Sequence, residues 1–427
     1  MVTTDASEAP VPHGPAAPRP LDPAPAVPRG ARKLRVLHLI HHLELGGAEV
    51  LLTGLLPRLD RTAFAVHAAC VDRGGPLVDV LRGRGVPTHV IGRRGAADLG
   101  VVGRPARLLR DLRIDLVNTH AFSAGFWGRL AARQARTPLV VATMHATAGW
   151  RRPLKHRLLN RLLLPGTDRL VAVSRAVKTS LIEREHVPAA RISVIPNGID
   201  PDRLRTADAP AALRASHGIP AAGHVVGMVA RCRAEKGGPV FIAALAHLVR
   251  AGRDIQGVLV GDGPALAEWR RIAADAGLGD RLRFAGSDPD VARWLGCMDV
   301  LVCPSIEESF GLVALEGLAA GVPVVASRVG GLQEILADGR DARLVDAGDA
   351  RATAAAVAEL IDRPALAREL VRGGRRKIAE HYAIDGTAAR YAALYRDLAA
   401  GSSALSLRGP ARATSTPSRV EKDRKTG

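Results

Sequence analysis

Short apolar runs alternate with amphipathic segments along most of this chain. The runs are rich in Val, Leu and Ile, as expected for parallel strands that are covered on both faces. They lie at residues 34–40, 65–71, 88–92, 115–119, 139–144, 169–173 and 192–195, and again at 224–230, 256–260, 282–286, 300–303, 323–327 and 342–345. Helical segments separate most of them, so the pattern predicts an α/β fold with two Rossmann-like, doubly wound parallel sheets.

Changes in composition divide the chain into segments. Both ends lack hydrophobic periodicity, and the first is rich in Pro and Ala, so we expect disordered tails. The predicted segments are a disordered tail (1–33), an N-terminal domain (34–200), a Pro- and Ala-rich linker (201–222), a C-terminal domain (223–375), C-terminal helices (376–400) and a disordered basic tail (401–427).

The composition favours a cytoplasmic protein. Hydrophobic residues make up 47% of the 427 residues and aromatic residues only 3%, so the cores are built from Leu, Val and Ala. The four cysteines lack metal-ligand spacing and fit a reduced cytosol. We expect no transmembrane helix, because no apolar run reaches about 18 residues, and no signal peptide, because the N-terminus lacks an apolar core.

The positive charge is unevenly distributed. The net charge is +18; residues 34–200 hold 25 basic and 12 acidic residues, whereas residues 201–400 hold 25 of each. This excess favours an anionic partner for the first half, either an acidic membrane surface or a phosphate-bearing acceptor; a general arginine bias is the alternative. Residues 150–164 form a basic, amphipathic helix, which either packs on the N-terminal domain or contacts anionic lipid. We expect no nucleic-acid partner.

The segment 304–327 combines two carboxylates with a predicted helix start. Strand 300–303 leads into Glu308, and a helix is expected to begin near Gly311, which leaves the amides of Gly311 and Leu312 unbonded. These amides and the helix dipole form a site for a diphosphate, which Gly311 would let approach closely. Glu308 would face a sugar beyond the phosphates, and Glu316 would reach the ribose hydroxyls.

Further candidate groups follow other predicted strands. Arg231 and Lys236, five positions apart in a loop with glycine, suit a pair of phosphates. Gly47 lies in a Gly-Gly loop between a strand and a helix, which also suits phosphate approach or a simple tight turn. Gly261 lies in a glycine-rich turn beside the base or phosphates, although a strand-to-helix crossover needs such a turn anyway.

Two histidines close predicted strands of the first domain. His120 ends the strand at 115–119, and His145 ends the strand at 139–144. Ligands of doubly wound sheets bind beyond the carboxyl ends of strands, so both histidines lie on the expected face. A single histidine at such a position is more often structural, but two favour a functional role.

The chain resembles glycosyltransferase family 4 over residues 34–400. The match rests on Glu308, seven intervening residues and Glu316, with Phe310-Gly-Leu between them. The resemblance implies the two-domain GT-B architecture, with the last helices crossing back to the first domain. It implies that His120 is catalytic near the reacting sugar, together with Glu308, and that His145 lies near the acceptor. It implies that Arg231 and Lys236 bind the donor diphosphate, although Ala230 replaces a common glycine and Arg233 adds a third cation.

The predicted reaction is transfer of a hexose-type sugar from a nucleotide diphosphate sugar to a hydroxyl acceptor, which is a glycan, a lipid-linked molecule or a small molecule. The resemblance implies retention at the anomeric carbon. No aspartate pair has metal spacing, so we expect no metal and no cofactor, with cations and a helix terminus meeting the leaving diphosphate. The alternatives are a sugar-nucleotide epimerase, a non-catalytic binding protein, and an oxidoreductase, which the missing G-x-G-x-x-G disfavours.

Overall fold

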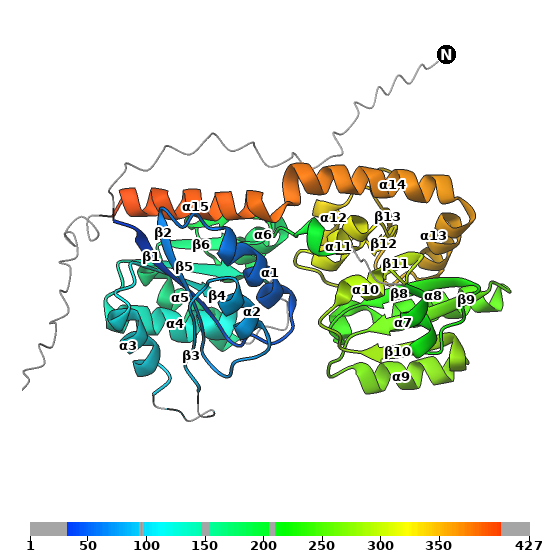
Figure 1. Ribbon diagram of the computed structural model, residues 1–427, viewed down its shortest axis with the longest axis horizontal. Helices are drawn as coiled ribbons and strands as arrows, with labels where there is room; N and C mark the ends of the chain where they lie inside the picture. Colours follow the sequence, from blue (N-terminus) through cyan, green and yellow to red (C-terminus); the bar gives the residue numbers. More distant parts are fainter. Residues whose placement is uncertain are drawn as a thin grey trace, which may run out of the picture.

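The computed structural model describes residues 32–402 except residues 94, 96, 97, 99, 147–153 and 205–209. Most of the predicted tails, 1–31 and 403–427, lies outside the described residues. The described chain forms two lobes side by side, and each is built around one parallel sheet (Figure 1). We call them the N-terminal lobe and the C-terminal lobe. The α/β class with two doubly wound sheets, predicted from the hydrophobic pattern, is confirmed.

The N-terminal sheet has the strand order β3-β2-β1-β4-β5-β6-β7. Val36 of β1 pairs with Val66 of β2 on one side and with Leu116 of β4 on the other. The order reverses between β1 and β4, so a crevice opens beyond their carboxyl ends. The strands are β1 (Leu34–Ile40), β2 (Phe64–Cys70), β3 (Thr88–Val90), β4 (Leu116–His120), β5 (Leu139–Met144), β6 (Arg169–Ala172) and β7 (Ile192–Val194).

The C-terminal sheet repeats this arrangement in the order β10-β9-β8-β11-β12-β13. Its order reverses between β8 and β11, where Val226 pairs with Val300, so the second crevice lies beyond those two strands. The strands are β8 (His224–Val229), β9 (Ile255–Val260), β10 (Leu282–Gly286), β11 (Val300–Cys303), β12 (Val324–Ser327) and β13 (Arg343–Val345).

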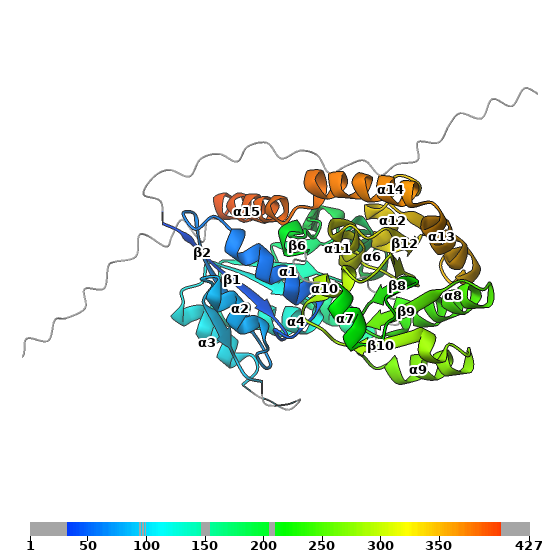
Figure 2. The ribbon, with the colours of Figure 1, turned by 45° about the vertical axis from the view of Figure 1, so that its right-hand side comes forward.

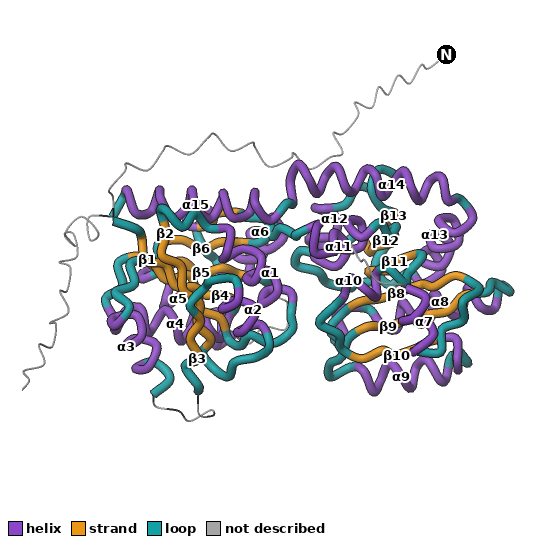
Figure 3. Tube along the Cα trace, viewed as in Figure 1, coloured by secondary structure: helices purple, strands orange, loops and turns teal. Residues whose placement is uncertain are grey.

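Helices cover both faces of each sheet (Figure 3). In the N-terminal lobe they are α1 (Gly47–Leu55), α2 (Leu77–Gly83), α3 (Gly103–Asp111), α4 (Phe122–Ala135), α5 (Leu154–Leu163) and α6 (Arg175–Glu185). After them come α7 (Pro210–Ser216), α8 (Gly238–Arg250), α9 (Leu266–Asp275), α10 (Val291–Leu295), α11 (Leu312–Ala320), α12 (Gly330–Ile335), α13 (Ala350–Asp362), α14 (Pro364–Lys377) and α15 (Ile384–Ala400).

Two segments differ from the sequence-based expectation. From the sequence we expect the helix after the Gly-Gly loop to run from about Ala48 to Leu59. Helix α1 instead ends at Leu55 and continues as a 3₁₀ turn, Leu56–Arg58, because Pro57 has no N–H for the α-helical ladder. The segment expected as a linker contains α7, which is anchored to the C-terminal lobe. Its Arg214 guanidinium donates two hydrogen bonds, of 2.6 and 3.1 Å, to the carbonyl oxygen of Cys297.

The chain returns to the N-terminal lobe at its end. Helix α14 packs on α11, a π-helical stretch, Ile378–Tyr382, follows, and α15 then lies along the N-terminal sheet (Figure 2). Tyr391 and Tyr395 of α15 are 1% and 0% exposed, so this last helix completes the core of the first lobe.

Apolar side chains also join the lobes directly. One continuous cluster of buried residues contains Val177 and Leu181 of α6 together with Phe310 and Leu332 of the C-terminal lobe. Because Phe310 lies in the Glu308–Gly311 loop, this contact positions the loop against the first lobe.

Candidate active site

A cavity of about 760 Å³ lies between the lobes, at the crevices beyond the carboxyl ends of the strands. Cavities of roughly 300–1,000 Å³ suit small-molecule ligands. The predicted site residues that line it are Gly47, His145, Arg231, Lys236, Glu308, Gly311 and Leu312. The structure therefore brings seven of the ten predicted residues together at one cavity.

The loop after β8 presents three cations to this cavity. The Arg233 guanidinium lies 3.9 Å from Glu235 Oε1. Arg231 is exposed and forms neither an ion pair nor a hydrogen bond with any residue that the structure describes. Of the two arginines, only Arg233 has an ionic partner among the described residues, and at 3.9 Å that partner is too far away for a hydrogen bond.

Glu308 forms an ion pair with Lys236 at the cavity wall. The ammonium Nζ of Lys236 donates to Glu308 Oε2 over 2.7 Å, and the hydroxyl of Ser305 donates to the same oxygen over 3.2 Å. The backbone N–H of Ser309 donates to the other oxygen, Oε1, over 3.2 Å. The side chains of Lys236 and Glu308 are 26% and 15% exposed, so both remain accessible from the cavity.

Helix α11 begins at this wall, and Gly311 is its N-cap. Gly311 has φ = 99°, which favours glycine, and a Cβ there would lie 2.6 Å from Leu332 Cδ2. On the side of Gly311 where a side chain would project, Leu332 thus occupies the space that we expect to admit a phosphate. Leu312 and Val313 line the cavity, and their amides lie in the first turn, where an α-helix has no internal acceptors.

Two side chains tie the C-terminal lobe to the start of helix α6 in the other lobe. The hydroxyl of Ser174 accepts a hydrogen bond from the N–H of Val177 (3.1 Å) and donates one to the carbonyl oxygen of Ser309 (2.6 Å). The carboxylate of Glu334 accepts from the N–H of Arg175 over 2.8 Å. Ser174 is therefore the N-cap of α6, and its hydroxyl also holds the residue next to Glu308.

The Gly46-Gly47 loop holds a carboxylate of its own. A Cβ at Gly46 would lie 2.4 Å from Glu49 Oε2, so the Glu49 side chain folds back over the start of α1. Burial raises the pKa of Glu49, and the positive charges near it, including Arg231 across the cavity, partly oppose that rise. The helix terminus that we expect to face a phosphate is therefore already next to an internal anion.

The two predicted histidines are adjacent, but only one reaches the cavity. His145 is partly exposed and lines the cavity, whereas His120 is 0% exposed and lies behind it. His120 Nδ1 lies 3.0 Å from His145 Nε2. Burial lowers the pKa of His145 to about 4 and that of His120 well below its ordinary value, so both rings are neutral near pH 7.

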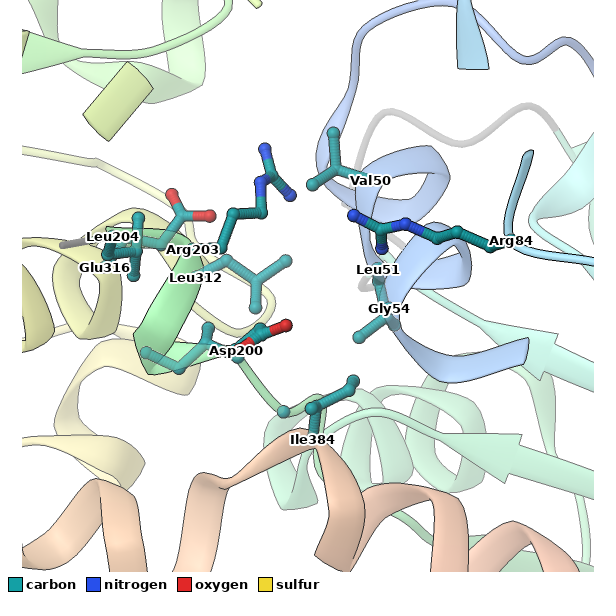
Figure 4. Close-up of a pocket in the computed structure, with 12 residues that line it drawn as sticks. Val50, Leu51, Gly54, Arg84, Asp200, Arg203, Leu204, Leu312, Glu316 and Ile384 are labelled. Carbon is teal, nitrogen blue, oxygen red and sulfur yellow. The ribbon is translucent and has the colours of Figure 1, made fainter. Parts of the chain in front are cut away.

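Glu316 and Gly261 do not line the main cavity. Glu316 faces a recess of about 30 Å³ next to it, where Leu312 forms a shared wall and Arg203 lies nearby (Figure 4). Burial raises the pKa of Glu316, and the Arg203 charge opposes this. Gly261 has φ = 140°, and a Cβ there would lie 1.8 Å from the Ala230 carbonyl oxygen. Gly261 thus allows close packing behind the cation loop.

Sequence comparisons identify the family. The profile described as Glycosyltransferase Family 4 matches residues 45–203, and the profile described as Glycosyl transferases group 1 matches residues 211–377. A D-inositol 3-phosphate glycosyltransferase of Thermobispora bispora is 34% identical over 309 residues, which cover 67% of this chain and 71% of that protein. The chain is a family 4 glycosyltransferase.

Other relatives of this glycosyltransferase agree. The 2-deoxystreptamine glucosyltransferase of Streptomyces kanamyceticus is 30% identical over 316 residues, 70% of this chain and 81% of that protein. The match to a D-inositol 3-phosphate glycosyltransferase of Streptomyces avermitilis, 33% identical, covers 66% of this chain and 65% of the relative's length. All three relatives are named as transferases, so the comparisons do not favour the epimerase or binding-protein alternatives.

Solved structures confirm the predicted GT-B fold of the glycosyltransferase. Anabaena HepE in complex with UDP and glucose superposes with a TM-score of 0.76 at 22% identity, over 85% of this chain and 99% of that one. Sucrose-phosphate synthase from Thermosynechococcus elongatus gives a TM-score of 0.72 at 24% identity, over 87% and 100%.

Several residues of the glycosyltransferase site are not predicted from the sequence. Asn197 lines the cavity and is 4% exposed, and its side-chain oxygen Oδ1 has no hydrogen-bond partner among the described residues. In the sequence it reads only as part of an Asn-Gly turn. Glu334 follows a Gly-Gly pair, yet no local pattern shows that it caps a helix of the other lobe. His38 lies in the middle of an apolar strand, and that unusual position is the only signal it gives.

Proposed function

We propose that this glycosyltransferase moves a hexosyl group from a nucleotide diphosphate sugar to a hydroxyl acceptor, with retention and without a metal ion. The observation that carries the proposal is the shared cavity wall formed by Arg231, Lys236 and the start of α11. Two cations and unbonded helix amides at one place match the two negative phosphates of such a donor. HepE, a protein of the same fold, is solved with UDP and glucose, which suggests a uridine nucleotide as the first donor to test.

The same groups can stabilise the leaving diphosphate. As the bond between the anomeric carbon and the phosphate oxygen breaks, negative charge develops on that oxygen. Preorganised donors at such a position contribute about 3 kcal/mol each. Lys236 is held 2.7 Å from Glu308, so the ammonium and the carboxylate are already placed beside each other. In this proposal Lys236 binds the phosphate and Glu308 faces the positive charge that develops on the sugar.

The acceptor approaches from the N-terminal lobe in this proposal. Its hydroxyl oxygen bonds to the anomeric carbon on the face that the diphosphate leaves, and its proton passes to the departing phosphate oxygen. Gly47, His145 and Asn197 form the cavity wall on this side. The relatives are named for D-inositol 3-phosphate and 2-deoxystreptamine, both polyhydroxylated six-carbon rings. Rings of this kind are therefore the acceptors to test first, before glycans and lipid-linked molecules.

Calorimetry with UDP-, GDP- and ADP-glucose tests the donor. One nucleotide sugar should bind the wild type, and binding should weaken by orders of magnitude in Arg231→Ala/Lys236→Ala while the circular dichroism spectrum is unchanged. Product formed with the active donor should keep the anomeric configuration in proton NMR, and EDTA should not reduce the rate. Unchanged donor affinity in the double variant would refute the diphosphate assignment, and an inverted product or an EDTA-sensitive rate would refute retention or metal independence.

We further propose that the N-terminal lobe binds the anionic surface of a membrane through α5. Leu158 and Leu162 lie one turn apart and are 58% and 65% exposed, whereas Leu163 is buried against the lobe. The exposed Arg161 lies between Leu158 and Leu162 in the sequence. Exposed leucines flanked by cations are typical of interfacial helices. None of the helices that the structure describes has the length and apolar character required to cross a bilayer. Part of the predicted helix, 150–153, lies outside the described residues.

Sedimentation with vesicles tests the membrane contact. Wild type should bind vesicles that contain phosphatidylglycerol, and not neutral ones, and high salt should release it. Leu158→Ser/Leu162→Ser should reduce binding, whereas Val80→Ser, which alters an exposed apolar residue of α2 at 38% exposure, should not. Equal binding of all three proteins would contradict the role of α5.

A further inference from the structure

Seven polar side chains form a continuous hydrogen-bonded chain from α15 to the cavity. In order, they are Tyr391, Thr143, Asn118, Tyr395, His38, His120 and His145. The first six are at most 1% exposed, and His145 lines the cavity. Buried polar groups of this kind are retained only with partners, so the chain is a built feature and not a surface coincidence.

The first part of the chain links the two tyrosines. The Tyr391 hydroxyl lies 3.3 Å from Thr143 Oγ1, and the Thr143 hydroxyl donates to Asn118 Oδ1 over 2.9 Å. The amide nitrogen of Asn118 then donates to the Tyr395 hydroxyl oxygen over 2.7 Å. Tyr391 and Tyr395 come from α15, while Asn118 lies on β4 and Thr143 on β5.

The second part consists of three imidazoles. The Tyr395 hydroxyl lies 3.2 Å from His38 Nε2, His38 Nδ1 lies 2.9 Å from His120 Nε2, and His120 Nδ1 lies 3.0 Å from His145 Nε2. Burial lowers the pKa of His38 to about 3 and that of His145 to about 4, and it lowers the pKa of His120 well below its ordinary value, so each ring is neutral near pH 7. A neutral imidazole has one donor and one acceptor nitrogen. All three rings must therefore donate in the same direction.

Tyr391 determines that direction. Among the described residues, Thr143 is the only hydrogen-bond partner of the Tyr391 hydroxyl, so the Tyr391 hydrogen must be donated to Thr143. Thr143 then donates to Asn118, Asn118 to Tyr395, and Tyr395 to His38. In the reverse order the hydrogen of Tyr391, which is 1% exposed, would have no acceptor, and an unmade hydrogen bond at a buried hydroxyl is costly.

We propose that this directed chain fixes His145 as the tautomer that carries its hydrogen on Nδ1, so that it presents a hydrogen-bond donor and not a base to the cavity. The ligand of this donor is an oxygen lone pair, from either a sugar hydroxyl or a phosphate. That ligand rests on the proposed function, whereas the tautomer is a property of the protein alone. Asn118, Tyr395, His38 and His120 are positioning residues, and His145 is the group that contacts the ligand.

Nitrogen-15 NMR of protein labelled at the imidazole nitrogens tests the tautomer without any substrate. The His145 resonances are assigned by their loss in His145→Gln. In the wild type we expect a protonated Nδ1 and an unprotonated Nε2. Asn118→Asp replaces the amide donor with a second acceptor oxygen, so Tyr395 should donate to Asp and accept from His38. His145 should then switch to the tautomer with its hydrogen on Nε2.

A matched control distinguishes an effect of the hydrogen-bonded chain on His145 from a general effect of substitutions in the core. Thr119, the next residue of β4, is also 0% exposed, and its hydroxyl donates to the Val141 carbonyl oxygen, which is not part of the hydrogen-bonded chain. Thr119→Val should therefore leave the His145 tautomer unchanged. If Asn118→Asp does not fold, Tyr395→Phe removes the donor to His38 and should give a mixture of His145 tautomers. The proposal would be overturned by a protonated His145 Nε2 in the wild type. It would also be overturned by an unchanged His145 tautomer in folded Asn118→Asp or Tyr395→Phe.

Kinetics then identify the oxygen that His145 contacts. The tautomer switch in Asn118→Asp should lower kcat/KM on the order of tenfold to a hundredfold, the range expected when a buried acceptor loses its donor. If the oxygen belongs to a phosphate, His145→Gln should weaken binding of UDP alone. If it belongs to a hydroxyl, UDP affinity should be unchanged and the KM of the sugar acceptor should rise. A switched tautomer with unaltered kinetics would overturn the functional half of the proposal.

Discussion

The two halves of this glycosyltransferase differ in where their charged side chains lie relative to the cavity. Residues 34–200 have 25 basic and 12 acidic residues, yet the residues they contribute to the cavity, such as Gly47, neutral His145 and Asn197, carry no charge. Residues 201–400 have 25 of each, and they supply all the charged residues of the cavity lining: Arg231, Arg233 and Lys236 together with Glu235, Glu307 and Glu308. The net charge of a lobe therefore does not predict whether charged side chains line its side of the cavity.

Screening explains this contrast. At physiological ionic strength, exposed charges are largely screened beyond about 8 Å, so most arginines on the first lobe cannot act on a ligand in the cavity. A few groups at strand ends determine the local field. The excess on the first lobe can act only on what touches its outer surface, which is why we propose a role for it in membrane binding and not in donor binding.

The largest expected effect follows from the cation wall. Arg231→Ala should lower kcat/KM about a hundredfold, because it removes an uncommitted donor to the leaving diphosphate worth about 3 kcal/mol. Arg233→Ala is the matched control in the same loop and should have a much smaller effect, since the Arg233 guanidinium already lies 3.9 Å from Glu235. Steady-state kinetics at constant ionic strength measures both. Equal losses would mean that the loop acts only through its total charge.

The fold and the cation wall could be predicted from the sequence because their signals are local. The predicted and observed strand ends agree within about two residues, since each strand is a short apolar run. Arg231, Lys236 and Glu308 lie in loops directly after such runs. The chain of imidazoles could not be predicted. His38 and Tyr395 are 357 positions apart, and their contact depends on α15 crossing back to the first lobe.

The glycines show a second limit of sequence reasoning. Positive φ values at Gly261 and Gly311 are consistent with the turns expected there. The structure, however, places Ala230 and Leu332 in the space beside them, where the sequence suggests a phosphate. A missing side chain shows that something approaches closely, but the sequence does not show whether that is a ligand or the protein itself.

An intermediate effect is expected at the contact between the lobes. Ser174→Ala should lower kcat/KM on the order of tenfold, because the Ser309 carbonyl oxygen loses its donor from α6 and the residue next to Glu308 is no longer fixed. It also removes the cap of α6, so thermal unfolding should shift slightly downward. Ser174→Thr keeps a hydroxyl and should restore most of the activity. If Ser174→Ala retains full kcat/KM, the hydrogen bond to Ser309 does not hold the active loop in place.

The smallest effect near neutral pH concerns stability and again separates the lobes. His38 is 0% exposed with its pKa lowered to about 3, against an ordinary value of 6.5. The unfolded chain therefore binds a proton at His38 below pH 6.5, while the folded chain does so only near pH 3. Stability is fully present above pH 6.5 and falls as the pH drops towards 3, by about 1.4 kcal/mol per pH unit for this residue once the pH is well below 6.5.

Hydrogen exchange compares this loss in the two lobes. Between pH 7 and pH 6 the unfolding equilibrium should change only about threefold through His38, and by much more at pH 5. After correction for the intrinsic exchange rate, protection of peptides from β1 and β4 should fall with pH before that of peptides from β8 and β11. The described histidines of the C-terminal lobe that precede α14, His217, His224 and His247, are all at least partly exposed, so that lobe lacks an equivalent buried base. Protection lost in parallel in both lobes would show that the imidazole chain does not make the first lobe acid-sensitive.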